Sequence, residues 1–198
     1  MISCLFVFIR VNPCASVVSF SVMPESKLIY LSLGSNLGDR AANLERAVEA
    51  LSGIGVRVLR RSSTYETEPV DFLEQPWFLN CAVEAETLIE PRQLLDGLQA
   101  IESRLGSRKL VQRGPRMIDL DILFYESAVI QEAGMEIPHP RLAERRFVLI
   151  PLAEIAPEFR HPVLRKTAAE LLAAAPDRSA VRILRTPQGA TGSQSSGN

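Results

Sequence analysis

The stretch Lys27-Leu-Ile-Tyr-Leu-Ser-Leu33, followed directly by Gly34-Ser-Asn-Leu-Gly38, decides how this chain folds. A short apolar run that ends in a glycine-bounded loop is typical of a buried strand entering a tight turn. Asn36 or Asp39 can cap a helix after the loop, because apolar residues then recur at helical spacing at Leu44, Ala47, Val48 and Leu51. The domain is therefore predicted to open with strand, loop and helix.

The same patterns continue along the chain. Residues 56–67 are rich in β-branched side chains and 78–87 alternate, so two strands are predicted around the loop 69–76. Pro91 begins a second predicted helix, and 117–125 form a further strand. The order β-α-β-β-α-β is the ferredoxin-like arrangement, which predicts the α+β class with an antiparallel sheet and helices on one face.

The remaining segments extend this domain. A small hairpin is expected at residues 129–137, a packed helix at 147–155 and a short helix at 168–175. We expect a single domain over residues 24–186 and a disordered tail over 187–198. Residues 1–23 are expected to be disordered or outside the translated chain, because their apolar runs are shorter than the ~20 residues of a membrane span and lack the features of a secretory signal.

Composition restricts the classes of partner. The 198 residues carry a formal net charge of −1, so no overall field favours nucleic acid or an anionic membrane. The three cysteines form no C-x-x-C pair, which favours a reducing cytoplasm. We expect a cytoplasmic protein, a monomer, without a nucleic-acid or membrane partner.

Asp119 and Asp121 lie two residues apart in the predicted strand 117–125. Side chains alternate along a strand, so both carboxylates are predicted to share one surface while Ile118, Leu120 and Ile122 face the core. Such a pair suits Mg²⁺, which is often held by one or two carboxylates together with substrate phosphates. An exposed acidic patch on an edge strand is the alternative interpretation.

Several cations precede these carboxylates in the sequence. Arginine binds phosphate oxygens bidentately, and lysine acts more as a point charge, so cations beside a carboxylate pair favour a metal-bridged polyphosphate. A solvated basic loop is the alternative, and we favour it for Arg104. The cations are Arg104, Arg108, Lys109, Arg113 and Arg116.

A second polar group lies further along the chain. His139 is enclosed by two prolines in a rigid turn, and Arg145 follows it. A lone histidine is as often structural as functional. No G-x-x-x-x-G-K-[ST] motif occurs, so a bound nucleotide must be held by side chains rather than by a P-loop.

The loop between the second and third strands offers a site for a flat heterocycle. An aromatic ring with an amide side chain can stack on such a ring and hydrogen-bond to it, although Trp77 and Phe78 are equally suited to closing the core. The candidates are Thr67, Pro69, Val70, Phe72, Trp77, Phe78 and Asn80.

Taken together, these residues resemble the 6-hydroxymethyl-7,8-dihydropterin pyrophosphokinase family of the folate pathway. The resemblance covers about residues 27–160, and the Gly-Pro-Arg…Asp-Leu-Asp block is its most specific part. The matching stretches are 31–38, 63–67, 78–83, 114–123 and 137–142, with Arg145, Phe147, Pro151 and Leu152.

The resemblance implies a ferredoxin-like fold and transfer of pyrophosphate from ATP to the pterin hydroxymethyl group, releasing AMP. The substrates would be ATP and a reduced pterin, and Asp119 and Asp121 would bind two Mg²⁺ ions. The implied catalytic residues are Arg108, Arg116, Asp119 and Asp121. The implied ATP-binding residues are Gln99, Glu102, Lys109, Arg116, Ile122, His139 and Arg145. The implied pterin-binding residues are Thr67, Val70, Phe78, Asn80, Asp119 and Phe147.

Two departures from the family pattern stand near the predicted site. Arg113 occupies a position where many members have tryptophan, and Ser107-Arg108-Lys109 stands where a pair of arginines is common. Two other classes of function remain open at this point. An RNA-binding module is disfavoured because no stacked aromatic pattern occurs on the central strands. A metal-dependent phosphodiesterase would use the same carboxylates to activate water.

Overall fold

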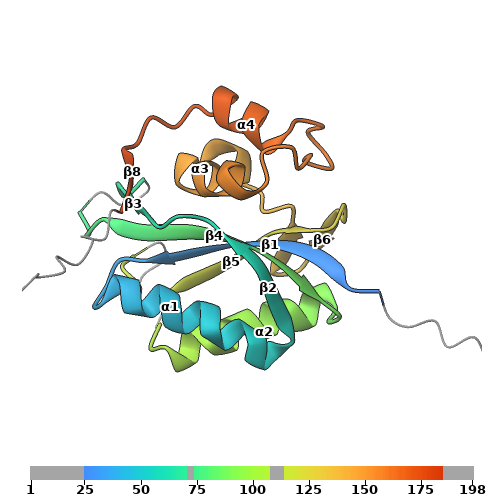
Figure 1. Ribbon diagram of the computed structural model, residues 1–198, viewed down its shortest axis with the longest axis horizontal. Coiled ribbons are helices and arrows are strands. Elements are labelled where there is room, and N and C mark those ends of the chain that lie inside the picture. The colour runs from blue at the N-terminus through green and yellow to red at the C-terminus, as the bar shows by residue number, and fades with distance from the viewer. Residues whose placement is uncertain (1–24, 71–73, 108–113, 185–198) are drawn as a thin grey trace, which may run out of the picture.

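The computed structural model describes residues 25–70, 74–107 and 114–184. A six-stranded antiparallel sheet forms the centre of the molecule (Figure 1). Its main path runs β5-β1-β4-β3-β8, and β2 also pairs with β4. The strands are β1 (Lys27–Ser35), β2 (Val56–Arg61), β3 (Tyr65–Thr67), β4 (Phe78–Thr87), β5 (Asp119–Tyr125) and β8 (Val181–Ile183).

One face of the sheet packs on two helices, α1 (Arg40–Leu51) and α2 (Pro91–Arg104). Asp39 caps α1, since its Oδ1 accepts a hydrogen bond from the Ala42 amide at 3.0 Å. Pro91 occupies the first turn of α2, where a missing N–H costs nothing. The predicted strand-loop-helix opening and the second helix are thus confirmed, and their apolar stripes fill the main core with Leu44, Ala47, Leu51, Leu94, Leu98 and Ile101.

The opposite face is covered as well, by α3 (Arg146–Ile155) and α4 (Ala168–Ala174) (Figure 1). Tyr30, Ala82 and Phe124 point from the sheet into this second core. The sequence predicted α3 and α4 correctly as helices but assigned helices to one face only. The sequence did not show that the second face is covered, because the strands β1 and β4 are buried on both sides and only β1 reads as a continuous apolar run, whereas β4 alternates like a strand with one solvent-facing side.

The predicted strand 56–67 is wrong as a single element, since it divides into β2 and β3, which both pair with β4. The Ser62 hydroxyl accepts from the Ala82 amide at 2.9 Å and so replaces a backbone partner where the chain turns. Strand β8 was not predicted, because three residues carry too little periodicity to be detected. The predicted strand 117–125 begins at Asp119.

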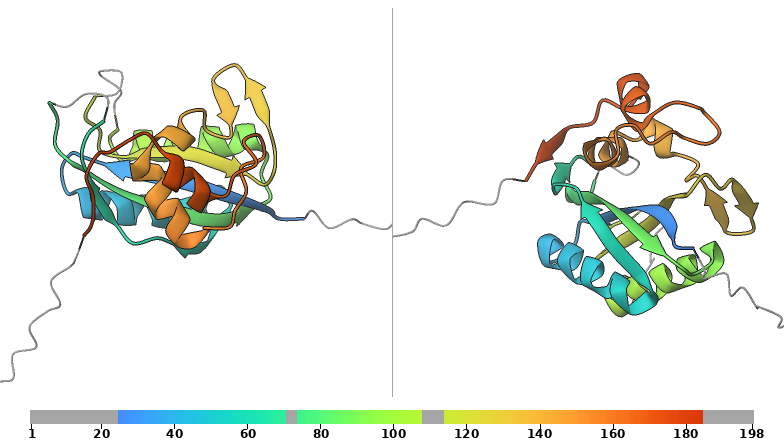
Figure 2. Two further views of the ribbon diagram at one scale, coloured as in Figure 1. Left: turned by 90° about the horizontal axis from the view of Figure 1, so that it is seen from above. Right: turned by 45° about the vertical axis from the view of Figure 1, so that its right-hand side comes forward.

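The predicted hairpin is confirmed as β6 (Ile130–Glu132) and β7 (Met135–Ile137), which project beside the sheet (Figure 2). Single turns of 3-10 helix follow α1 at Ser52–Ile54 and precede α3 at Leu142–Glu144. Within the described ranges, none of the helices combines the length and apolar character needed to cross a membrane. The hairpin and the start of α3 border the two pockets described below.

Candidate active site

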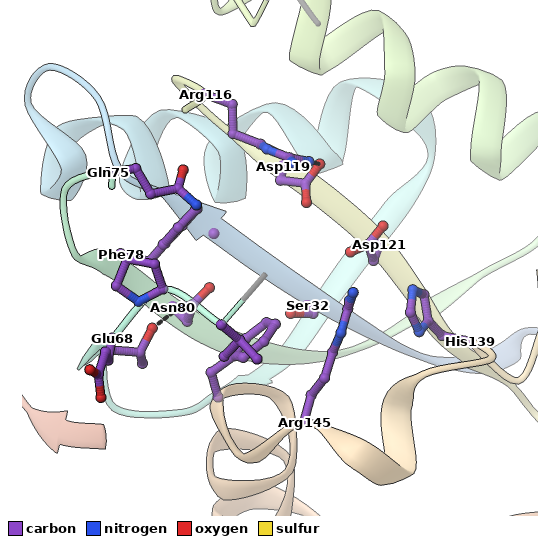
Figure 3. A pocket seen from close by; sticks show the side chains of 15 residues that line it. Ser32, Glu68, Gln75, Phe78, Asn80, Arg116, Asp119, Asp121, His139 and Arg145 are labelled. Atoms are coloured by element: carbon purple, nitrogen blue, oxygen red, sulfur yellow. Dashed lines mark hydrogen bonds and ion pairs between the residues drawn. The ribbon is translucent and has the colours of Figure 1, made fainter. Parts of the chain in front are cut away.

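A pocket of about 260 Å³ opens on the sheet face that α3 covers (Figure 3). Strands β1, β4 and β5 form its floor, the segment after β3 forms one wall, and the start of α3 forms the opposite wall. Its lining residues are Ser32, Gly34, Thr67, Glu68, Pro69, Val70, Gln75, Phe78, Asn80, Arg116, Asp119, Asp121, His139, Arg145 and Phe147.

Asp119 and Asp121 both face this pocket, as their alternation on β5 predicts, while Leu120 and Ile122 are buried. Arg116 makes an ion pair with Asp119, with Nη1 2.6 Å from Oδ1. Burial raises the pKa of Asp121 to about 7, and the neighbouring charge of Asp119 adds to this effect, while Arg145 opposes it. Asp121 is therefore a carboxylate that gains from a nearby cation.

The number of carboxylates in the pocket limits which metal ion it can bind. Among the described residues, no three Asp, Glu, His or Cys side chains converge on one point, which argues against a metal held by protein ligands alone. Mg²⁺ commonly takes one or two carboxylates and completes its shell with water and phosphate oxygens. Asp119 and Asp121 fit that requirement, because both line the pocket and the charge of Asp121 is costly without a cation.

His139 lies across from Asp121, and Arg145 extends toward the same carboxylate (Figure 3). Burial and the charge of Arg145 lower the pKa of His139 to about 4, so the ring is neutral at physiological pH. Its Nδ1 accepts from the Arg141 amide at 3.2 Å, which leaves the proton on Nε2. The neutral ring therefore offers an N–H donor to the site.

The start of α3 supplies the wall opposite the segment that follows β3. Arg145 occupies the N-cap position of this helix, and Phe147 follows in the first turn. The Arg145 guanidinium carbon lies 5.4 Å from the centre of the Phe147 ring, so the cation and the aromatic face stay close together. One short segment thus brings a cation and an aromatic ring to the pocket.

The floor of the pocket between β1 and β4 carries a buried amide side chain. Asn80 donates from Nδ2 to the Thr67 hydroxyl at 2.7 Å, and both side chains are almost completely buried. A Cβ atom placed on Gly34 would lie 2.6 Å from Asn80 Oδ1, so only glycine leaves room for this amide. Phe78 lines the pocket beside it, whereas Trp77 is not among the lining residues. Of the two aromatic candidates, the structure brings Phe78 to the site.

Asn36 connects the loops around the pocket, a role that sequence analysis missed by treating it as a possible cap. Its Nδ2 donates to Gln75 Oε1 at 3.0 Å and to the Pro76 carbonyl at 3.2 Å. Its Oδ1 accepts from the Arg116 amide at 2.8 Å, across 80 positions of sequence. The glycine-bounded loop of residues 34–38 was the available signal, because a buried asparagine in a tight loop usually binds backbone groups.

A second pocket, of about 460 Å³, adjoins the first along the hairpin. Ile122 lines this pocket, and β6 and β7 supply much of its rim; the nucleotide-side role of Ile122 stays a prediction. Asp121 and His139 line both pockets. The site therefore has two compartments that meet at a carboxylate and a neutral histidine.

Two predicted residues, Gln99 and Glu102, line neither pocket, and two others lie outside the described residues. Gln99 is exposed on α2 and lines neither pocket, so its role stays a prediction. Glu102 is buried, and its Oε1 accepts from the Leu120 amide at 2.8 Å, which braces the edge strand β5. Arg108 and Lys109 lie outside the described residues, as do Phe72 and Arg113.

The fold and the site define an α+β protein of the ferredoxin-like type, with a two-compartment pocket that joins paired carboxylates to several cations. Comparison with known proteins agrees with this class. The 7,8-dihydro-6-hydroxymethylpterin-pyrophosphokinase (HPPK) family matches residues 30–157. The chain belongs to this family.

Two relatives and one solved structure illustrate the similarity. The chain is 41% identical over 165 residues to a Bacillus subtilis 2-amino-4-hydroxy-6-hydroxymethyldihydropteridine pyrophosphokinase, covering 83% of this chain and 94% of that protein. It is 45% identical over 139 residues to the Pneumocystis carinii folic acid synthesis protein fol1, covering 70% of this chain and 19% of that protein. The chain thus spans about a fifth of the fungal protein that it matches.

A crystal structure of a Plasmodium falciparum HPPK-DHPS variant superposes with a TM-score of 0.63 at 17% sequence identity. The match covers 78% of this chain and 46% of that one. At this level of identity the superposition supports the fold alone.

Proposed function

We propose that this protein transfers the β,γ-pyrophosphoryl group of ATP to the hydroxymethyl group of 6-hydroxymethyl-7,8-dihydropterin, giving the pterin diphosphate and AMP in folate synthesis. The observation that carries the proposal is the meeting of two compartments at Asp121 and His139. One compartment suits a polar heterocycle and the other adjoins the apolar Ile122. Membership of the HPPK family supports the same reaction.

In the first compartment, the pterin ring would stack between Phe78 and Phe147. Asn80 and Thr67 are already joined by a hydrogen bond, so their remaining polar atoms are held in place for the edge of the ring. Val70, 37% exposed, would cover the outer rim. Because Asn80 and Thr67 are held in place before binding, these two side chains would lose little conformational entropy when the ring enters.

In the second compartment, Ile122 would contact the adenine, and the triphosphate would extend toward the paired carboxylates. Arg116 and Arg145 would bind phosphate oxygens, and neutral His139 would donate from Nε2. Gln99, Glu102, Arg108 and Lys109 are proposed on the nucleotide side from the family resemblance.

Asp119 and Asp121 would hold Mg²⁺, with two ions proposed when ATP is bound. When bound, the metal neutralises phosphate charge and makes the β-phosphorus more open to attack. The pterin oxygen forms a bond to that phosphorus while the bond from phosphorus to the α,β-bridging oxygen breaks, and the hydroxyl proton is released to solvent. Arg116, Arg145 and His139 orient the reacting groups and stabilise charge, so positioning and electrostatics supply the acceleration.

Three further features belong to the proposal. We propose that the protein is a monomer and that it lies in the cytoplasm; the buried Cys81 thiol, which is in no disulfide, and the absence of C-x-x-C pairs from the sequence support the second of these two proposals. We also propose that residues 24–186 act as one catalytic domain, consistent with two cores that share a single sheet.

The test mixes the protein with ATP, Mg²⁺ and 6-hydroxymethyl-7,8-dihydropterin and separates the products by chromatography. AMP and the pterin diphosphate should form in equal amounts, and only when the pterin is present. Formation of ADP, or AMP release without the pterin, would contradict the proposal and favour a hydrolase.

A further inference from the structure

The two walls of the first pocket come from distant parts of the chain. A third segment, which follows α4, forms hydrogen bonds with both of them. Residues 67–70 form one wall, and Arg145 and Phe147 at the start of α3 form the other. After α4, the chain passes α3 and ends its described course beside β3 as strand β8 (Figure 1). We call residues 177–183 the C-terminal strap.

One end of the strap caps α3. Arg145 occupies the N-cap position, and a cation there provides no acceptor for the free amides of the first turn. Asp177 supplies the missing acceptor, because its Oδ2 accepts from the Arg146 amide at 2.9 Å. Its Oδ1 accepts from the Ser179 amide at 2.8 Å, which fixes the direction of the strap.

The carboxylate of Asp177 also suits this place electrostatically. A negative charge at a helix N-terminus is favourable, whereas Arg145 at the same terminus is not. Burial works to raise the pKa of Asp177, but the hydrogen bonds from Ser179 and Arg146 outweigh it and hold the pKa below its usual value. Asp177 therefore stays charged and offsets the cation that the site requires.

The other end of the strap braces the opposite wall. The Glu68 amide donates to the Ala180 carbonyl at 3.0 Å, and the Ala180 amide donates to Glu68 Oε2 at 3.1 Å. Thr67 then pairs with Val181 in the sheet. These bonds hold the backbone of a wall that carries Thr67 and Glu68 at the pocket; Glu68 is labelled in Figure 3.

The strap and α3 are tied together at the end nearest the pocket. At the far end of α3, Glu154 accepts hydrogen bonds from Ser63 and Tyr65, so that end is already joined to β3. Asp177 makes the corresponding connection at the near end, where Phe147 emerges. The separation between the two walls is thus set at both ends of one helix.

We propose that Asp177 is a positioning residue for pterin binding: it orients the Arg145–Phe147 wall toward the Thr67–Glu68 wall through the strap. The inference rests on the proposed function of this pocket. Asp177 is not among the residues that line the pocket, so it acts through Phe147 rather than on the substrate. Loss of its carboxylate should weaken pterin binding more than it slows the chemical step.

The experiment compares Asp177→Ala and Asp177→Asn with a matched control, Glu170→Ala. Glu170 caps α4 in the same part of the chain, through the capping box with Thr167, but contacts neither wall. The dissociation constant of the reduced pterin is measured by its fluorescence with a non-hydrolysable ATP analogue and Mg²⁺ present. Steady-state kcat and KM are measured alongside, well below the melting temperature of each variant.

We expect Asp177→Ala to raise the pterin dissociation constant and KM about tenfold, with kcat changed less than threefold. Asp177→Asn keeps one acceptor oxygen for the Arg146 amide and should show a rise of about threefold. Glu170→Ala should lower the melting temperature and leave pterin binding unchanged. Should Asp177→Ala fail to fold, the Asp177→Asn variant decides the question by the same comparison.

Equal pterin affinity in Asp177→Asn and the unsubstituted protein would overturn the role of Asp177. A variant in which kcat falls while pterin affinity stays the same would also overturn it, because the effect would then lie on the chemical step. An unsubstituted protein that forms no pterin-dependent AMP would instead contradict the proposed function. The two failures are therefore distinguishable.

Discussion

Replacement of Asp121 by asparagine should stabilise the metal-free protein while abolishing its activity. The carboxylate is partly buried beside Asp119, and its pKa rises from 3.8 to about 7 through burial first and the charge of Asp119 second. A raised folded-state pKa means that the folded protein binds the proton more tightly than the unfolded chain. Stability is therefore lost as the pH rises from about 4 through about 7, and the ionised form carries the penalty.

The size of the penalty follows from the shift. At 1.36 kcal/mol per pKa unit, three units correspond to at most about 4 kcal/mol, and solvent screening of a partly exposed group reduces this to about 2 kcal/mol. For a chain of this size, about 2 kcal/mol raises the melting temperature by roughly 4–8 °C. The free energy of unfolding of Asp121→Asn should exceed that of the unsubstituted protein by this amount at pH 8 and by little at pH 4.

The assay is thermal unfolding by circular dichroism at pH 4, 6 and 8, with EDTA and separately with Mg²⁺ and a non-hydrolysable ATP analogue. The ligands should stabilise the unsubstituted protein more than the variant, and turnover of the variant should fall by several orders of magnitude. Asp119→Asn is the comparison variant: it removes the charge that adds to the raised pKa of Asp121 but also breaks the ion pair with Arg116, so its gain in stability at pH 8 should be smaller than that of Asp121→Asn. An Asp121→Asn variant that is less stable at pH 8 with EDTA, or that keeps near-normal turnover, would refute the reasoning.

Three further outcomes are expected. Gly34→Ala places a methyl group 2.6 Å from Asn80 Oδ1 and must displace this buried amide, so the melting temperature should fall and pterin kcat/KM should fall at least tenfold; unchanged kcat/KM would count against it. Asn36→Ala removes three side-chain hydrogen bonds, so kcat and melting temperature should both fall, unlike Ser52→Ala on the surface. Glu154→Ala loses the hydrogen bond from the Tyr65 hydroxyl at 2.9 Å, so denaturant titration should show a loss of stability of about 1–2 kcal/mol, and pterin affinity should fall less than in Asp177→Ala because Glu154 lies at the far end of α3.

Much of the fold followed from local pattern. The apolar run of β1, the stripe of α2 and the cap at Asp39 each act within a few residues, so period and capping were sufficient to predict these elements. The division between β2 and β3 was not predictable in this way, because it depends on a Ser62 hydroxyl that bonds to β4 from 20 positions away. The short β8 forms only because β3 offers a free edge.

The site also has features that local pattern predicted and features that depend on tertiary packing. Alternation on one strand placed Asp119 and Asp121 on a common face, and the spacing of the sequence was enough to predict it. The positions of Arg145, Phe147 and His139 above that face depend on α3 and the hairpin folding back over the sheet. The periodicity of side chains along one element contains no information about where a later helix or hairpin packs on the sheet.

The sequence by itself determined the elements, the shared face of the carboxylates and the kinds of side chain available for phosphate and for a flat ring. Only the tertiary structure decided that α3 covers the second face, that Asn36 links the loops to Arg116, and that Asp177 caps the helix on which Phe147 stands. The physical reason is the distance along the sequence between the residues that make contact. Side-chain periodicity reports burial along one element, whereas these contacts join residues 31 and 80 positions apart, and their partners become evident only when the chain has folded.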